Sequence, residues 1–403
     1  MTLPREEPQT VVDGTAGAER QRLDGRNRVL AALRRLGPVS RAELARRTSL
    51  APSTVSTIVG ELQRAGLVDE LAGHATAPGT KGGRPPILLA LHRSAGVAVG
   101  IDLGRRHLRV AVSDLAHTLL AERNLTVTRD RDAREDIESA VALVGELLTE
   151  AGVERDQVVG VGMGLPGPVH RDTGELGHST ILPGWVGVSA ATAMTEALGL
   201  PVTVDNDANL GAISEWMWGS GRDASELAYL KIGTGIGAGL IIAGRPYRGA
   251  GGTAGEIGHT VIDPAGPICR CGNRGCLEMS AGTGAVLDAL RPTHGGELSI
   301  HRVVSLARDG DAGCRRAIAD AGHAIGTALA TLCNLVNPQV IVVGGELGAA
   351  GEILLTPIRD ALTRGTIRSA AGDVTVLESA LGDRAEVLGA VALALRSGTS
   401  LQT

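Results

Sequence analysis

Apolar residues near the N-terminus recur with the spacing of short amphipathic helices. The first helix is predicted over residues 28–36. Ser40, with Glu43 three residues on, has the spacing of a capping box and predicts a second helix. A third helix is predicted from Pro52, and its apolar stripe follows the i, i+3, i+4, i+7 pattern: Val55, Ile58, Val59 and Leu62. Three short helices of this kind predict a helix-turn-helix.

The third helix carries small hydroxyl side chains outside its apolar stripe, namely Ser53, Thr54, Ser56 and Thr57. Because the last helix of a helix-turn-helix enters the major groove of DNA, these side chains are candidates for contacts with base edges and phosphates. Two strands, residues 66–68 and 87–91, are predicted to form a wing. The segment between them, residues 78–86, is rich in glycine and proline and carries Lys81 and Arg84. A Gly-Arg-Pro sequence can place its arginine in a narrow A·T minor groove.

From Gly96 onward, apolar runs of strand length alternate with longer helical stretches. Strands are predicted over residues 97–103, 108–112, 119–128, 158–167, 227–232, 237–243 and 340–345, and helices over residues 133–151, 281–291, 301–309, 312–335 and 386–396. Two halves that each open on strands with glycine turns indicate a duplicated α/β domain. The expected organisation is a disordered N-terminus over residues 1–22, a winged helix-turn-helix over residues 23–92 and an α/β domain over residues 95–400.

The charge of the chain is unevenly distributed. The formal net charge of the 403 residues is −5, but the first fifth is basic. Over residues 20–84 the basic residues are Arg20, Arg22, Arg26, Arg28, Arg34, Arg35, Arg41, Arg46, Arg47, Arg64, Lys81 and Arg84, against Asp24, Glu43, Glu61, Asp69 and Glu70. This asymmetry fits a DNA-binding module attached to a different domain. A helical protein-interaction domain with solvated arginines is the alternative.

The sequence shows no membrane or secretory signal. No apolar run of about 18 residues is free of charge or glycine interruptions, and the N-terminus has no apolar core of a signal peptide. We therefore expect a cytoplasmic protein whose thiols are reduced or metal-bound. Cys314 and Cys333 lie among Ala, Ile and Leu and are expected to be small core residues.

The other three cysteines cluster in a loop over residues 256–279. The imidazole of His259 and the thiolates of Cys269, Cys271 and Cys276 make the Cys₃His set that a structural Zn²⁺ prefers. With four protein ligands, such a zinc has no open position for a reactive water. Ordinary buried thiols or a disulfide are the alternatives, although the single residue between Cys269 and Cys271 makes a bridge between them awkward.

Two carboxylates flank the candidate metal site. Glu256 precedes His259 by three residues, and Glu278 follows Cys276 by two. Carboxylates that accept charge-assisted hydrogen bonds from hydroxyls bind sugars well. Surface acids on a loop are the alternative.

The pattern His-x₉-Cys-x-Cys-Gly-x-x-Gly-Cys-x-Glu, from His259 to Glu278, resembles the signature of the ROK family (repressor, open reading frame, kinase). This family joins bacterial sugar kinases to sugar-responsive repressors. The N-terminal segment resembles the winged helix of ROK repressors, which the kinases lack. The resemblance implies an actin-like sugar-kinase fold with the ligand between two lobes. It also implies a ligand set of Asn206, Asp207, Glu256, His259 and Glu278.

The resemblance raises the question of kinase activity. In the family's kinases, an aspartate at the position of Asp207 is the base that takes a proton from the sugar hydroxyl. The alternative is that residues 206–209 are an Asn/Asp cluster that only caps a helix. The glycines of residues 233–239 could cradle phosphate or simply form a hairpin. Family kinases open with Asp-x-Gly-Gly-Thr-Lys, whereas residues 102–107 here read Asp-Leu-Gly-Arg-Arg-His. Because Arg105 and Arg106 would fill space meant for nucleotide, we expect ATP binding to be lost.

These features predict a sugar-responsive transcriptional regulator, expected to be a repressor, that binds double-stranded DNA and a sugar or sugar phosphate. Symmetric operators favour a homodimer or tetramer. The alternative is an ATP-dependent hexose or N-acetylhexosamine kinase that also binds DNA. A regulator that answers to a protein partner, with an empty cleft, is a third possibility.

Overall fold

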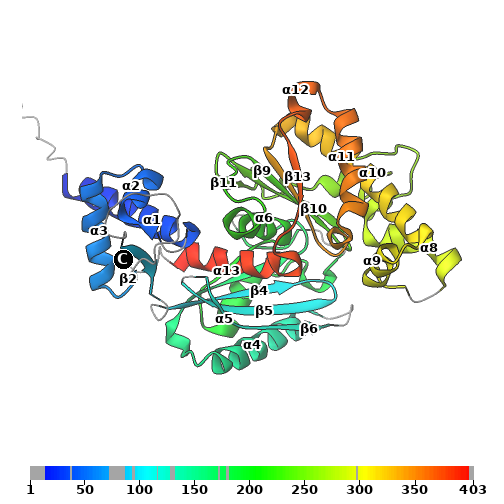
Figure 1. Ribbon diagram of the computed structural model, residues 1–403. Helices are drawn as coiled ribbons and strands as arrows, with labels where there is room; N and C mark the ends of the chain where they lie inside the picture. The colour runs from blue at the N-terminus through cyan, green and yellow to red at the C-terminus, as the bar shows by residue number, and fades with distance from the viewer. Residues whose placement is uncertain are drawn as a thin grey trace, which may run out of the picture. The chain divides into compact units, whose positions relative to one another are not determined.

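The computed structural model describes residues 14–36, 39–71, 87–92, 96–115, 117–127, 132–170, 173–177, 181–295 and 298–398. The chain divides into two compact units (Figure 1). The first comprises residues 1–95 with 115–117, and the second comprises residues 96–114 with 118–403. The predicted wing loop with Lys81 and Arg84 lies outside the described residues, as do residues 1–13.

Over its described residues, the first unit contains three helices and a small antiparallel sheet. The helices are α1 (Gly14–Leu36), α2 (Arg41–Thr48) and α3 (Pro52–Arg64), and the sheet has the order β1 (Val39–Ser40), β3 (Leu88–Leu91), β2 (Val68–Leu71). The apolar stripe of α3 is buried as predicted. At the start of α2, the Ser40 hydroxyl accepts a hydrogen bond from the amide of Glu43 at 3.3 Å. The helix-turn-helix prediction is confirmed.

The first helix is longer than predicted. Residues 14–22 were expected to be disordered, but they belong to α1. Their sequence contains alanine, glutamate, glutamine and arginine, which favour helix, and no proline. A helix anchored by the buried residues Val29, Leu30 and Leu33 therefore continues toward the N-terminus.

Two five-stranded sheets of identical topology form the framework of the second unit. The first has the order β6 (Leu119–Thr126), β5 (His107–Asp114), β4 (Val97–Leu103), β7 (Val158–Leu165), β8 (Val202–Asn206); the second has the order β11 (Arg245–Tyr247), β10 (Ile236–Ile242), β9 (Leu227–Ile232), β12 (Val340–Gly344), β13 (Thr375–Glu378). In each sheet the first three strands along the chain are antiparallel and the other two run parallel to the central strand. This repeat confirms the predicted duplicated α/β domain.

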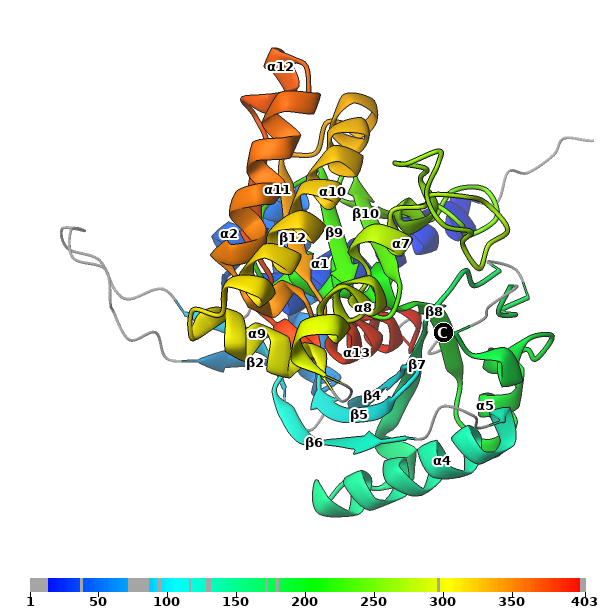
Figure 2. The ribbon, with the colours of Figure 1, turned by 90° about the vertical axis from the view of Figure 1, so that its right-hand side faces the viewer.

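Helices cover the sheets of the second unit (Figures 1 and 2). Packed on the first sheet are α4 (Ala133–Glu150) and α5 (Ala190–Leu198); near the second sheet lie α7 (Glu278–Ala281), α8 (Thr283–His294), α9 (Ile300–Arg308), α10 (Ala312–Val336), α11 (Glu352–Gly365) and α12 (Arg368–Ala371). None of the described helices combines the length and apolarity that a membrane span requires.

Helices α6 (Asp207–Trp218) and α13 (Ala385–Gly398) pack against each other, α13 on β4 and β7 and α6 on β9 and β10. The approach is close because glycine has no side chain. A Cβ at Gly162 of β7 would lie 1.9 Å from the carbonyl oxygen of Ala390, and a Cβ at Gly389 would lie 2.0 Å from that of Leu210. At these glycines the backbones of the packed elements approach each other directly, and the two helices connect the two sheets.

Candidate functional site

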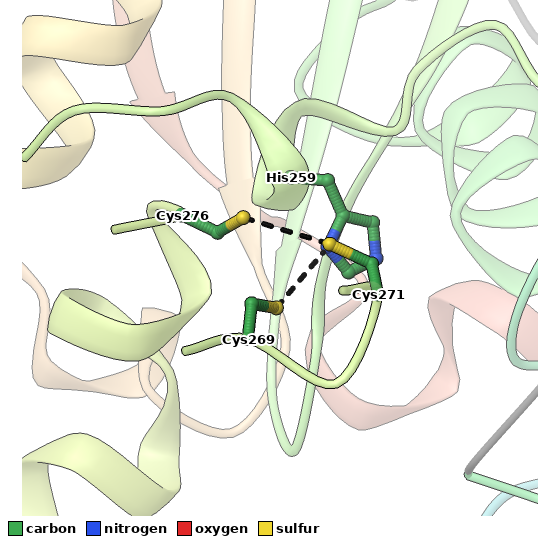
Figure 3. Close-up of side chains that lie close together, drawn as sticks. All are labelled: His259, Cys269, Cys271 and Cys276. Atoms are coloured by element: carbon green, nitrogen blue, oxygen red, sulfur yellow. Dashed lines mark hydrogen bonds between the residues drawn. The ribbon is translucent and has the colours of Figure 1, made fainter. Parts of the chain in front are cut away.

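The predicted metal ligands meet in space (Figure 3). One ring nitrogen of His259 and the sulfurs of Cys269, Cys271 and Cys276 all lie within 4.8 Å of one another. The Nδ1 atom of His259 is 3.6 Å from Cys269 Sγ, and Cys271 Sγ is 3.7 Å from Cys276 Sγ. Ligands of a tetrahedral Zn²⁺ are about 3.3–3.8 Å apart, given its usual bond lengths. The cluster therefore fits a four-coordinate zinc.

A tight turn brings the three sulfurs together. The amide of Cys269 donates to the carbonyl of Asn273 at 2.7 Å, and the amide of Gly272 donates to the carbonyl of Cys269 at 3.0 Å. Gly272 and Gly275 adopt φ angles of +91° and +69°, where other residues are strained. A Cβ at Gly275 would also lie 1.5 Å from the carbonyl oxygen of Asp263. The Gly-x-x-Gly spacing is thus what this turn requires.

His259 links the metal cluster to a cavity. Its Nδ1 faces the sulfurs, whereas its Nε2 lies 3.8 Å from Glu256 Oε2. His259 and Glu256 line a cavity of about 330 Å³, formed by loops that follow strands of both sheets in the second unit. The whole ligand set that the resemblance implied lines it: Asn206, Asp207, Glu256, His259 and Glu278.

Asn206 and Asp207 stand where β8 meets α6. Asn206 is the N-cap of this helix, which begins at Asp207: its side-chain oxygen accepts from the amides of Ala208 and Asn209 at 2.9 and 3.2 Å. Its side-chain nitrogen donates to the carbonyl of Gly167 at 2.9 Å. Asn206 therefore caps the helix, and the carboxylate of Asp207 beside it lines the cavity.

An ammonium group lies against Asp207. The Nζ atom of Lys231, at the end of β9, is 2.8 Å from Asp207 Oδ2 and 3.7 Å from Glu386 Oε1. Burial alone would lower the pKa of Lys231, but the carboxylates of Asp207 and Glu386 outweigh it and raise that pKa well above its usual value. The charge of Asp207 is thus neutralised inside the cavity.

A second cation pairs with Glu278. The guanidinium of Arg270, in the loop of residues 256–279, donates to Glu278 Oε2, and both residues line the cavity. Glu256 has no such partner at hydrogen-bond distance among the described residues. Burial, together with the nearby charges of Asp207 and Glu278, raises the pKa of Glu256 to about 7.

The opposite part of the cavity contains the residues that depart from the kinase motif. Arg105 and Arg106 line it. His107 folds back over the turn: its Nε2 lies 2.8 Å from Asp102 Oδ2, and a Cβ at Gly104 would lie 2.1 Å from the ring. Burial would raise the pKa of Asp102, but the adjacent His107 lowers it to about 2. The imidazole therefore fills the space over Gly104 and pairs with the carboxylate of Asp102.

The predicted DNA-reading side chains lie on one face of α3. Ser53, Thr54, Ser56 and Thr57 are all exposed. The hydroxyl of Ser56 donates to the carbonyl of Pro52 at 2.9 Å, and that of Thr57 donates to the carbonyl of Ser53 at 3.1 Å. Each hydroxyl oxygen keeps acceptor capacity toward solvent.

Sequence reasoning missed three cavity residues: His107, Lys231 and Arg270. The position of each residue in the sequence gave a weak indication that it lies near the site. His107 takes the place of the lysine in the kinase motif, Lys231 stands two residues before the glycine turn, and Arg270 separates two metal ligands. The partner of Lys231, Asp207, is distant in sequence, whereas His107 and Arg270 pair with the nearby Asp102 and Glu278 through turns whose side-chain directions spacing alone does not fix.

Comparison with known proteins agrees with this architecture. Residues 98–397 match the ROK family, and residues 28–74 match the MarR family. A protein named putative xylose repressor, from Caldicellulosiruptor sp. (strain Rt8B.4), is 32% identical over 89% of this chain and 92% of its own length.

Two solved structures are similar in fold. The crystal structure of a ROK family transcriptional regulator, a homologue of the E. coli MLC protein, has a TM-score of 0.76 at 28% identity and covers 94% of this chain and 98% of its own. A ROK family glucokinase from Streptomyces griseus, in complex with glucose and AMPPNP, has a TM-score of 0.66 at 27% identity and covers 74% of this chain and 99% of its own. The chain is a member of the ROK family, with a MarR-type winged helix-turn-helix ahead of the ROK domain.

Proposed function

We propose that this chain is a carbohydrate-responsive, DNA-binding transcriptional repressor. The observation that carries the proposal is the presence of a helix-turn-helix and a ROK domain in one chain. The ROK transcriptional regulator is similar over 94% of the chain, whereas the glucokinase is similar over 74%. The relative named putative xylose repressor makes a sugar the first effector class to test.

In this proposal the cavity binds its ligand without phosphorylating it. Two observations support this. Lys231 holds the carboxylate that would act as base, Asp207, at 2.8 Å, and His107 occupies the turn and carboxylate that open the kinase motif. A general base must reach the proton it accepts, and a phosphoryl donor needs room in line with it.

The metal site has a structural role in this proposal. Zinc bound by His259, Cys269, Cys271 and Cys276 would fix the loop that carries Arg270 and Glu278 into the cavity. With four protein ligands it would have no open position for chemistry.

DNA recognition is assigned to the exposed face of α3, with Ser53, Thr54, Ser56 and Thr57 in the major groove. Lys81 and Arg84 would reach phosphate and the minor groove from the wing loop. Because helix-turn-helix proteins read two half-sites, the active form would be a homodimer or a tetramer.

A sugar changes DNA affinity only if it binds one arrangement of the protein more tightly than another. The test is therefore a linked measurement. The operator is first selected from a random duplex pool, and its affinity is then measured by fluorescence anisotropy with and without a panel of sugars. We expect at least one sugar to change the dissociation constant about tenfold or more. If selection yields no preferred sequence, the chain does not act as a regulator; if a preferred sequence emerges but no sugar alters its affinity, a protein effector is favoured instead.

The kinase alternative retains one argument, because Asn206, Asp207 and the 233–235 glycine turn all line the cavity. It predicts sugar-dependent ADP release that is lost in Asp207→Asn. Robust turnover of that kind would replace the sensor proposal.

A further inference from the structure

A second group of metal-binding side chains lies away from the cavity, where α8 ends and α10 begins. His294 is the last residue of α8, Asp311 is the N-cap of α10, and Cys314 lies in the first turn of α10. One ligand atom from each of these side chains lies within 4.8 Å of the other two. The helices α8, α9 and α10 pack against one another (Figures 1 and 2), and none of the three residues lines the cavity.

The three side chains converge on one point. Nε2 of His294 lies 3.2 Å from Asp311 Oδ2 and 3.8 Å from Cys314 Sγ. These distances are close to the spacing of about 3.3–3.8 Å between the ligands of a tetrahedral Zn²⁺. In a nucleophilic relay, the carboxylate and the thiol would instead contact opposite nitrogens of the imidazole. Here both face the same nitrogen, an arrangement that suits a shared cation.

The hydrogen bonds around His294 make this nitrogen an acceptor. The hydroxyl of Thr293 donates to the carbonyl of Leu290 at 3.1 Å. The same hydroxyl oxygen lies 2.9 Å from Nδ1 of His294, and because its proton is already used, Nδ1 is the donor. In a neutral imidazole, Nε2 then directs its lone pair at a carboxylate oxygen, which is also an acceptor. Two acceptors at this distance require a cation between them, either a proton on Nε2 or a metal ion.

The ligands are held in place for this role. Oδ1 of Asp311 accepts from the amide of Cys314 at 2.7 Å, so Oδ2 is the oxygen that faces the histidine. Such secondary hydrogen bonds commonly orient metal ligands. Gly313 leaves room for the ring, since a Cβ there would lie 3.2 Å from His294 Cε1. Cys314 is buried, but the side chains of His294 and Asp311 are 18% and 33% exposed, so an ion can enter from solvent.

The charges near the cluster are mixed. Burial and the carboxylate of Asp311 raise the pKa of Cys314 to about 11, and the guanidinium of Arg302 opposes this shift. A metal must therefore displace a proton from the thiol, and it meets a positive charge nearby. The cluster also offers three protein ligands, against four in the Cys₃His cluster. Of the two clusters, this one should bind zinc more weakly.

We propose that His294, Asp311 and Cys314 form a second metal site, which takes Zn²⁺ with a water molecule in the fourth position. A thiolate, an imidazole and a carboxylate together favour zinc over Mg²⁺ and Ca²⁺, which prefer oxygen ligands. The ion would fasten the end of α8 to the start of α10. Helix α7, which begins with Glu278 of the cavity, packs on both of these helices. The inference does not depend on the proposed sensing function.

The test is the zinc content of the full-length protein, measured by mass spectrometry. Dialysis against metal-free buffer should empty the second site and leave the zinc of the Cys₃His cluster. Equilibration with micromolar free zinc should then add about one ion per chain, as expected for one further site of this type. Cobalt in place of zinc should produce a thiolate-to-metal charge-transfer absorption.

His294→Gln and Cys314→Ser should each abolish this gain of zinc. Thr293→Val removes the hydroxyl that orients the ring, and it should weaken the second site about 10- to 100-fold. The controls are a histidine and a thiol outside both clusters, His301→Gln on α9 and Cys333→Ala on α10, which should gain zinc like the parent.

A parent protein that gains no zinc overturns the inference, as does a gain that persists in both His294→Gln and Cys314→Ser, because the ion would then bind elsewhere. Since His294 is partly exposed, its variant keeps the test decisive even if Cys314→Ser does not fold. The zinc that the parent retains after dialysis reports the Cys₃His cluster separately.

Discussion

The ammonium of Lys231 lies between two carboxylates, 2.8 Å from Asp207 and 3.7 Å from Glu386. These residues come from β9, α6 and α13, so one cation joins three elements around the cavity. Glu386 in turn accepts a hydrogen bond from the buried hydroxyl of Tyr229 at 3.0 Å. Removal of the cation would leave two buried acids without their cationic partner.

Lys231→Met should therefore destabilise the protein by about 3 kcal/mol, the cost of breaking a largely buried ion pair. Chemical denaturation of the variant and the parent measures this difference. The double variant Lys231→Met with Asp207→Asn should recover part of the loss, because one unpaired charge is removed with the other. Additive losses in the double variant would mean that the two side chains do not interact.

Cys271→Ser should abolish stoichiometric zinc and lower the melting temperature. Because the Cys271 side chain is exposed, its replacement costs little packing, and a loss of stability would report the metal. Metal content by mass spectrometry and a thermal melt are the measurements. Cys333→Ala is the control: this thiol is buried in the core, so its removal should lower stability but leave the zinc in place. Full zinc occupancy in Cys271→Ser would refute the ligand assignment.

The His107–Asp102 pair predicts a pH dependence of stability. Burial lowers the pKa of His107 but Asp102 outweighs it, so the net shift is upward, and the pKa of Asp102 is lowered from 3.8 to about 2. A raised histidine pKa stabilises the fold below the unfolded value near 6.5 and loses this contribution as the pH rises through the folded value. A lowered aspartate pKa stabilises the fold above 3.8, and this contribution is lost as the pH falls toward 2.

His107→Gln should therefore cost most at about pH 5 to 6, by roughly 1 kcal/mol because the ring is partly exposed, and less at alkaline pH. Urea denaturation across this range measures the difference from the parent. The exposed His301 on α9 supplies the control, since His301→Gln should not produce this profile. A cost of His107→Gln that does not change with pH would show that the ring acts by packing alone.

Arg84→Ala should weaken operator binding about tenfold and reduce the slope of affinity against salt by about one. Anisotropy at several salt concentrations measures both values. Arg316→Ala provides the comparison, because Arg316 is exposed on α10 in the second unit and pairs with Asp320. Equal operator affinity for Arg84→Ala and the parent at moderate salt would remove Arg84 from the interface.

The sequence was informative where a local pattern determines the structure. The stripe of Val55, Ile58, Val59 and Leu62 predicted a buried helix face, because the helical period alone places these apolar side chains on one face. The spacing from His259 to Cys276 likewise predicted a cluster, because glycine turns within the segment bring the ligands together.

The sequence was less informative about the direction in which side chains point within turns. Arg105 and Arg106 were expected to fill the space for nucleotide, but the side chain that lies over Gly104 and against Asp102 is that of the neighbouring His107. The direction of a side chain in a turn depends on its hydrogen-bond partner, here the buried carboxylate of Asp102. The spacing of residues along the sequence does not predict that direction. The start of α1 at Gly14 was missed for a related reason, since polar helix formers without an apolar stripe look the same as a disordered segment.

The two ring nitrogens of His259 face different neighbours, sulfur on one side and Glu256 on the other. One imidazole would therefore be shared by a bound zinc and a bound carbohydrate, and the two occupancies would be thermodynamically linked. Whatever factor zinc contributes to the affinity of the cavity for its ligand, the ligand must contribute to the affinity of the cluster for zinc. A chelator that removed the zinc would then weaken binding of the effector without entering the cavity. The response on DNA would depend on the concentrations of both the metal and the carbohydrate.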